Sequence, residues 1–457
     1  MNLCIFAQKD VRFNVNKKMP MERFAMQHLK KWKNKNNRKP MVIRGARQVG
    51  KTWLMKEFGK NEYKQTAYVN FESSKLLKTL FVDNFDIQRI ITALQIETGI
   101  QINAENTLII FDEIQEAEGA ITSLKYFYEN APQYHIISAG SLLGVALHQK
   151  ISFPVGKVEF LELYPLCFFE FLLAMEQKQL LELLNNKDWP LIKSFKEKYI
   201  QYLRQYYYIG GMPEVICTFK NKNNFQEVRD IQKQILSAYE QDFSKHAPNE
   251  IVPRIRMLWN SIPTQLAKEN KKFIYKIVKS GARAKDYELA LSWLIDCGLA
   301  YKHTRSLKPG IPLKAYEDYN AFKLFVVDVG LLAAMGDIDV KTLLDGNLIF
   351  EEFKGALTEQ YVLQQLITIS DIAIHYWSAE RSASEIDFMV QYSGVVIPIE
   401  VKAEENLQAK SLKAFCQKYS PSLAIRTSMS DYRKETWLTN IPLYAIGKLT
   451  SIIENVT

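Results

Sequence analysis

The chain has few of the residues that build metal sites or disulfide frameworks. Its five cysteines are scattered through 457 residues and never form a C-x-x-C pair, and its six histidines show no metal-ligand spacing. This pattern argues against a zinc site and is typical of a protein in a reducing cytoplasm. No apolar run approaches the length that crosses a bilayer, and the first residues do not resemble a signal peptide. We therefore expect a cytoplasmic protein without a membrane partner.

The overall composition is that of a globular protein with several domains. Hydrophobic residues make up 47% of the chain and charged residues 24%. A chain of this length is too long for a single core and predicts about two to four domains. The net charge of +9 permits a nucleic-acid partner but does not demand one, because it is spread over the whole chain.

Although the chain contains only 19 glycines, two of them fit the pattern G-x-x-x-x-G-K-[ST]. The stretch follows an apolar run and leads into a helical pattern, which is the setting that a phosphate-binding loop requires. Backbone N–H groups of such a loop point at phosphate oxygens near a helix N-terminus. Lys51 would reach the β- and γ-phosphates, and the Thr52 hydroxyl would bind Mg²⁺. The expected nucleotide-binding residues are Gly45, Ala46, Arg47, Gln48, Val49, Gly50, Lys51, Thr52 and Trp53.

A second motif lies 60 residues beyond Thr52, where an apolar run ends in Asp112 and Glu113. This is the form of a Walker B strand. Asp112 would hold the Mg²⁺ shell, and Glu113 would orient and deprotonate the attacking water. The alternative is a surface strand end that carries two solvated acids.

From residue 41 to about residue 165, expected strands alternate with helices. The expected strands are Met41–Arg44, Gln65–Phe71, Thr107–Phe111 and Tyr134–Ser138. Such alternation predicts a parallel sheet covered by helices, with ligands at the carboxyl ends of the strands. Ser138 or Ser141, at the end of the last of these strands, would sense the γ-phosphate. A helix cap or turn is the equal alternative.

These stretches resemble the AAA-superfamily ATPases of bacteria and archaea that carry a C-terminal DUF4143 domain. The resemblance begins near residue 21, covers nearly all of the chain, and implies a P-loop core with an additional central strand. The family usually has a Gly-Arg pair where this chain has Gly156-Lys157. As a charge-stabilising finger, Lys157 would lack the bidentate fork of arginine; otherwise it is an exposed strand residue. Besides the P-loop, the matching stretches are Tyr68–Glu72, Leu161–Leu166, Gly210–Glu214 and Phe322–Leu332.

The sequence predicts two helical regions in the middle of the chain. Residues 166–245 predict a helical lid over the nucleotide. Residues 246–340 predict a winged helix, with helices at Arg254–Ala267, Phe273–Val278 and Ala284–Cys297 before paired strands. Basic residues around its turn would contact DNA phosphates, or the domain only packs against the ATPase. These residues are Lys276, Lys279, Arg283 and Lys285.

The C-terminal third predicts a second site. A helix opening at Gly355 precedes strands at Ile374–Trp377, Glu385–Val390 and Val395–Lys402. Four residues fit the D…E-x-K spacing of the restriction-endonuclease-like, PD-(D/E)xK, fold: Glu359, Asp387, Glu400 and Lys402. Carboxylates at such a site collect Mg²⁺, and the lysine holds water or the developing charge. The alternative is a degenerate nuclease fold used for assembly or DNA contact.

We therefore predict an α/β protein in five parts. They are an N-terminal arm and helix (1–40), an AAA-type P-loop core with a parallel sheet (41–165), a helical lid (166–245), a winged-helix-like domain (246–340) and a nuclease-like α/β domain (341–457). The predicted activity is Mg²⁺-dependent ATP hydrolysis, with ATP and Mg²⁺ bound and with DNA and a second copy of the chain as further partners. The alternatives are an ATP-gated DNA nuclease and a slow nucleotide switch that cuts nothing.

Overall fold

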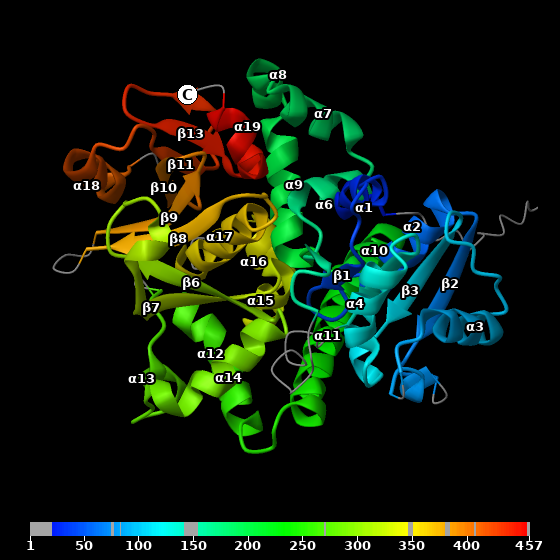
Figure 1. Cartoon of the computed structure of the whole chain (residues 1–457). Coiled ribbons are helices and arrows are strands. Elements are labelled where there is room, and N and C mark those ends of the chain that lie inside the picture. Colours follow the sequence, from blue (N-terminus) through cyan, green and yellow to red (C-terminus); the bar gives the residue numbers. More distant parts are fainter. Residues whose placement is uncertain are drawn as a thin grey trace, which may run out of the picture.

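The computed structural model describes residues 21–74, 77–82, 84–140, 154–268, 271–345, 351–379, 384–405 and 408–454. These residues form a five-stranded sheet and an eight-stranded sheet, with helices between and around them (Figure 1). Across the same ranges, no helix is long and apolar enough to cross a membrane.

The first sheet contains the phosphate-binding loop. Its strand order is β2-β3-β4-β1-β5, and all of its pairings are parallel. β4 lies between β1 and β3 as the additional strand, so the predicted P-loop core is confirmed. Each of the four expected strands lies within one residue of its predicted bounds. The strands are β1 (Met41–Arg44), β2 (Gln65–Asn70), β3 (Thr107–Asp112), β4 (His135–Ala139) and β5 (Glu159–Glu162).

Side chains alternate along β3 and build a core on each face of this sheet. Leu108 and Ile110 join the core that contains α1 (Ala25–Lys33) and α2 (Lys51–Glu62). Ile109 and Phe111 join the core that contains α3 (Ile87–Thr98) and α4 (Ala120–Asn130). Because successive side chains of a strand point to opposite faces, a continuous apolar run is what a strand covered on both faces requires.

The helical region follows β5 and ends at a long helix. Tyr206, Tyr207 and Tyr208 are buried, so this cluster belongs to the core rather than to a stacking surface, as predicted. The helices are α6 (Phe168–Ala174), α7 (Lys178–Asn186), α8 (Trp189–Ser194), α9 (Lys196–Ile209), α10 (Pro213–Lys222) and α11 (Phe225–His246).

Three helices and a hairpin follow in the predicted order. They are α12 (Val252–Leu266), α13 (Tyr275–Val278), α14 (Ala284–Asp296), β6 (Ala300–Ser306) and β7 (Glu317–Val326). The second helix is shorter than predicted. Phe273 lies outside it, because its backbone N–H donates to the carbonyl oxygen of Phe322 in β7 at 2.7 Å. That bond ties the residue to the sheet.

The second sheet runs through the remaining chain. Its order is β12-β13-β11-β10-β9-β8-β6-β7, so the hairpin β6–β7 continues into the C-terminal strands across the boundary expected at residue 340. The remaining elements are α15 (Val329–Met335), α16 (Val340–Asp345), α17 (Glu351–Leu366), β8 (Ala373–Ser378), β9 (Glu385–Tyr392), β10 (Val395–Val401), α18 (Lys410–Tyr419), β11 (Ile425–Ser428), β12 (Arg433–Lys434), β13 (Thr439–Pro442) and α19 (Leu449–Ile453).

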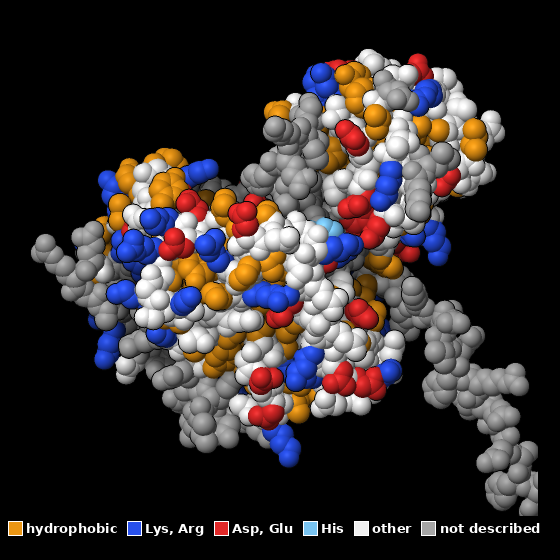
Figure 2. All heavy atoms as spheres, turned by 90° about the horizontal axis from the view of Figure 1, so that it is seen from below, with side chains coloured by type: hydrophobic (Ala, Val, Ile, Leu, Met, Phe, Trp, Pro, Cys, Tyr) orange, Lys and Arg blue, Asp and Glu red, His pale blue; other side chains and the backbone are white. Residues whose placement is uncertain are grey.

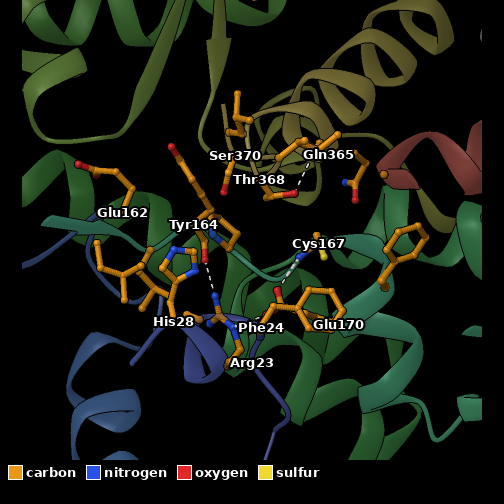
Figure 3. A pocket seen from close by; sticks show the side chains of 18 of the residues that line it. Arg23, Phe24, His28, Glu162, Tyr164, Cys167, Glu170, Gln365, Thr368 and Ser370 are labelled. Atoms are coloured by element: carbon orange, nitrogen blue, oxygen red, sulfur yellow. Dashed lines mark hydrogen bonds and ion pairs between the residues drawn. The ribbon is translucent and has the colours of Figure 1, made fainter. Parts of the chain in front are cut away.

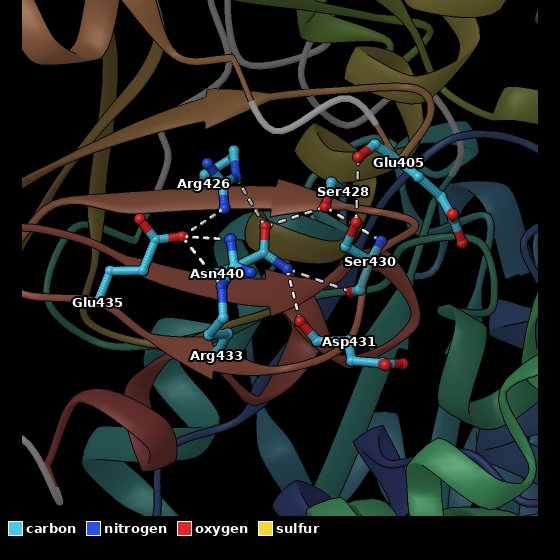
Figure 4. A network of polar contacts seen from close by, with 8 residues as sticks. All are labelled: Glu405, Arg426, Ser428, Ser430, Asp431, Arg433, Glu435 and Asn440. Carbon is cyan, nitrogen blue, oxygen red and sulfur yellow. Dashed lines mark hydrogen bonds and ion pairs between the residues drawn. The ribbon is translucent and has the colours of Figure 1, made fainter.

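A buried arginine stabilises one edge of this sheet (Figure 4). Arg426 in β11 is only 2% exposed, and its Nε donates to Asn440 Oδ1 at 2.9 Å. Its Nη2 pairs with Glu435 at 3.1 Å, and Glu435 also accepts from Arg433. A buried guanidinium needs such partners, so this network is structural.

Two stretches that carry the family resemblance meet at Asp328. This buried carboxylate caps α15 by accepting from Leu331 N at 3.1 Å, and it also accepts from Gly211 N at 2.6 Å. A Cβ at Gly210 would lie 2.0 Å from Asp328 Oδ1, so the close approach requires glycine. The contact joins the turn before α10 to the C-terminal helices.

Candidate nucleotide-binding site

The phosphate-binding loop connects β1 to α2, and two of its glycines are required by its shape. Gly45 has φ +141°, and a Cβ there would lie 2.2 Å from the carbonyl oxygen of Leu163. Gly50 has φ +95° and forms the N-cap of α2. The helix N-terminus therefore begins at Lys51, where backbone N–H groups favour an anion.

The Lys51 side chain folds back over the loop. Its Nζ donates to the carbonyl oxygens of Gly45 at 2.8 Å and Ala46 at 2.7 Å. Burial lowers the pKa of Lys51 to about 8, although the carboxylates of Glu113 and Asp112 oppose that shift. The amine is therefore mainly protonated near neutral pH, as a phosphate ligand must be.

Thr52 and Asp112 lie side by side, as the two motifs predicted. Thr52 Oγ1 donates to Asp112 Oδ2 at 2.8 Å, and Tyr68 donates its hydroxyl to the same oxygen at 2.9 Å. A hydroxyl and one carboxylate fit Mg²⁺, which usually takes its other ligands from phosphate and water. The described residues hold no cluster of three or more acids, histidines or cysteines suited to a metal.

Glu113 follows Asp112 in the left-handed region, with φ +49°. For a residue other than glycine this conformation costs about 1–3 kcal/mol and is common at functional sites. Glu113 Oε2 accepts a hydrogen bond from Gln115 Nε2 at 2.8 Å. The Glu113 side chain lines the same cavity as Lys51 and Thr52.

That cavity has a volume of about 490 Å³ and lies between the loop and two helices of the lid region. Its size is in the range of about 300–1,000 Å³ that is typical of ligand pockets. Pro213 and Glu214 of α10 and Asp242 of α11 contribute to its walls. The complete lining is Arg47, Gln48, Gly50, Lys51, Thr52, Trp53, Glu113, Pro213, Glu214, Ala238, Tyr239 and Asp242.

Arg23 supports the loop from behind, and sequence reasoning did not identify it. Its guanidinium donates to the carbonyl oxygens of Val49 at 2.9 Å and Tyr164 at 2.6 Å, and it pairs with Glu170 at 3.1 Å (Figure 3). Glu170 also accepts from the backbone N–H of Cys167 at 3.0 Å. A single arginine before the first helix shows no spacing pattern, so only the fold reveals this contact.

Two further predicted residues lie away from the cavity. Lys157 pairs with Glu129 at 2.9 Å and precedes Glu159, which is in register with Met41 at the start of β1. It is therefore at the opposite end of the sheet from the loop, and a finger role within its own chain is wrong. Ser138 also has another role, because its hydroxyl donates to the Met41 carbonyl oxygen at 3.2 Å. Ser141 lies outside the described residues.

The four residues of the predicted nuclease site fall into two groups by their side-chain partners. Glu400 pairs with Lys402 at 2.7 Å and accepts from the backbone N–H of Leu412 in α18 at 3.1 Å. Asp387 is instead hydrogen-bonded to Glu359. Burial raises the pKa of Asp387, and the charge of Glu359 adds to that shift. Asp387 also accepts from the backbone N–H of Val401, the residue after Glu400, at 2.8 Å.

A lysine from β7 occupies the centre of the second group. Lys323 is fully buried and pairs with Glu359 at 3.2 Å, with Glu385, and with Asp387 at 4.0 Å. Burial alone would lower its pKa, but these carboxylates outweigh burial and raise it. The ammonium group neutralises the acids from within the chain. Sequence reasoning missed Lys323 because it lies in a different strand, far from the D…E-x-K stretch.

The fold and the site together define a P-loop nucleotide-binding protein with an additional central strand. Comparison with protein families agrees with this class. Residues 37–172 match an AAA domain, residues 200–342 match a domain of unknown function, DUF8612, and residues 354–446 match another, DUF4143. The N-terminal part of the chain is thus similar to AAA domains, and the C-terminal part is similar to DUF4143 domains.

Solved structures include a Walker-type ATPase of Pyrococcus abyssi that resembles the chain. It is 13% identical, the match covers 72% of this chain and 99% of that one, and the TM-score is 0.42. A search of the curated proteins gave no match. The match to DUF8612 spans the expected boundary at residue 245 between the lid and the winged helix.

Proposed function

We propose that the protein binds ATP with Mg²⁺ between the loop and helices α10 and α11 and hydrolyses the γ-phosphate. The observation that carries this proposal is the Thr52–Asp112 contact of 2.8 Å at a cavity that Glu113 also lines. This arrangement supports a site at which the nucleotide, the metal ligands and the general base would meet.

Each side chain has a separate task in this reaction. Lys51 and the loop N–H groups bind the β- and γ-phosphates, and Thr52 and Asp112 would hold the metal, which would offset charge on the phosphate oxygens. Glu113 accepts a proton as water attacks the γ-phosphorus and the bond to the β-phosphate oxygen breaks. The products are ADP and phosphate.

The nucleotide-binding step is tested by Lys51→Ala. Removing the amine leaves the β- and γ-phosphates without their cation, and we expect ATP binding to become undetectable in calorimetric titration. Lys60→Ala is the matched control, because Lys60 lies on the same helix with an exposed side chain. ATP binding by Lys51→Ala at the affinity of the control would contradict the site.

We further propose that α13 and α14 contact DNA. Four basic residues around their turn are all exposed, and Figure 2 shows Lys and Arg side chains gathered over the lobe that contains these helices. Such side chains bind phosphates and release counterions from DNA. The order of three helices before a hairpin supports a winged-helix mode of contact. The four residues are Lys276, Lys279, Arg283 and Lys285.

Replacing these four residues by alanine is expected to weaken DNA binding and to make it less dependent on salt. Each phosphate contact contributes about 0.9 to the slope of log affinity against log salt concentration. Fluorescence anisotropy with a labelled duplex at several salt concentrations measures both effects. Lys60→Ala/Lys64→Ala, in the ATPase core, is the control. An unchanged slope in the fourfold variant would exclude this surface.

For the C-terminal domain we propose a role in assembly or DNA contact rather than cleavage. The order α17, β8, β9, β10, α18 and β11, an antiparallel meander followed by a parallel strand, supports a nuclease-like fold. Lys323, however, supplies the positive charge that a nuclease would take from a metal. The acids beside it then have no need of a divalent cation.

A further inference from the structure

The nucleotide cavity has two cations in its lining, Arg47 and Lys51. The Lys51 amine is buried over the loop carbonyls, as any P-loop lysine needs to be to reach the phosphates. The Arg47 side chain is 32% exposed and pairs with Asp242 in the last turns of α11. Arg47 is thus a residue of the phosphate-binding loop, and its side chain is paired with a residue of α11.

Helix α11 fixes Arg47 at two points. Besides the ion pair with Asp242, the Tyr239 hydroxyl donates to the Arg47 carbonyl oxygen at 2.9 Å. The next residue, Gln48, has φ +65°, so the loop turns sharply beside this attachment. Tyr239 is 1% exposed, so this hydrogen bond is shielded from water.

Three acidic side chains lie near Arg47. Burial works to lower its pKa, but Asp242, Glu113 and Glu72 outweigh burial and raise it. Glu113, the base of the proposed reaction, lines the same cavity as Arg47, so the guanidinium borders the space in which the γ-phosphate would lie. Lys157 lies at the far end of the sheet and cannot serve there.

We propose that Arg47 recognises the γ-phosphate and that Asp242 is a positioning residue that competes with this phosphate for the guanidinium. The inference rests on the proposed binding of ATP at the loop. Guanidinium binds phosphate through two parallel N–H···O bonds and is the stronger partner for a dianionic oxygen group. ADP has no γ-phosphate, so it leaves the Arg47–Asp242 pair in place.

This competition links the nucleotide to the rest of the chain. α11 ends at His246 and α12 begins at Val252, so the helix that carries Asp242 leads directly into the helices before the basic surface. Binding couplings are reciprocal. If bound ATP changes the affinity for a ligand that shifts α11, that ligand changes the affinity for ATP by the same factor. ADP affinity would stay the same.

The test compares the affinity for a non-hydrolysable ATP analogue with the affinity for ADP, both with Mg²⁺, by calorimetric titration of the full chain. Arg47→Ala is expected to weaken binding of the ATP analogue by about 10- to 100-fold, which is the value of a charged hydrogen bond, and to leave the affinity for ADP unchanged. Arg47→Lys should recover part of the loss. Asp242→Asn should increase the affinity for the ATP analogue by about 2- to 5-fold, because the carboxylate charge that competes for Arg47 is gone.

The outcomes separate this inference from the proposed function. If the native chain binds neither nucleotide, the proposed nucleotide site is wrong. If it binds both, and Arg47→Ala keeps the native ratio of ATP-analogue to ADP affinity, the role of Arg47 is wrong. If Arg47→Ala does not fold, Asp242→Asn decides: an unchanged ratio in that variant overturns the competition.

Discussion

A Glu113→Gln variant is expected to bind ATP with native affinity and to lose about 10²- to 10⁴-fold in the rate of hydrolysis. The amide has the size of the carboxylate but cannot accept the proton of the attacking water. Glu113 directly follows Asp112, the proposed Mg²⁺ ligand, and lines the cavity, which supports its carboxylate as the base. Phosphate release measures the rate, and titration of the ATP analogue measures binding.

Glu118→Gln provides the matched control, because Glu118 follows in the same connection but is exposed. Its rate should equal the native rate. A Glu113→Gln protein that hydrolyses ATP at more than about half the native rate would exclude Glu113 as the general base, whatever its affinity for ATP. Loss of both binding and hydrolysis would indicate damage to the loop instead.

Lys323→Met is expected to destabilise the C-terminal sheet by about 3–5 kcal/mol, the usual cost of removing one partner from a buried ion pair. The methionine fills the space of the lysine stem but leaves Glu385 and Asp387 without their cation, while Glu359 keeps only its pair with Lys271. Because the chain is large, unfolding should be followed by urea titration with more than one spectroscopic probe.

The control is Lys302→Met in the neighbouring strand β6, where the lysine is exposed. Loss of an exposed charge usually changes stability by less than about 0.5 kcal/mol. If both variants unfold at the same urea concentration, Lys323 does not neutralise the acidic group. The nuclease alternative would then gain support, since the acids would be free to bind a metal.

The P-loop core follows closely from the sequence because its signals are local. β1 agrees with its predicted bounds, and an apolar run that ends in acids defines β3. Helix α17 begins at Glu351 rather than at Gly355, because glycine is tolerated inside a helix at a cost of about 1 kcal/mol and need not mark its start. Phe273 lies outside the predicted helix, because its backbone N–H bonds to β7, a strand that follows much later in the chain.

Within the site, Thr52 and Asp112 could be paired from the sequence because parallel strands bring their carboxyl ends to one edge. The supporting contacts could not be predicted. Arg47 and Asp242 are 195 residues apart, and Arg23 and Glu170 are 147 apart. A single charged residue carries no periodic signal, so its partner is known only when the elements between them are placed.

The most direct test of the account is the release of phosphate from ATP by the purified full-length chain, with and without Mg²⁺. We predict release that requires Mg²⁺ and that disappears in Lys51→Ala, while Lys60→Ala keeps the native rate. No release by the native chain, or equal release by the native chain and Lys51→Ala, would contradict the assignment of an ATPase site to this loop.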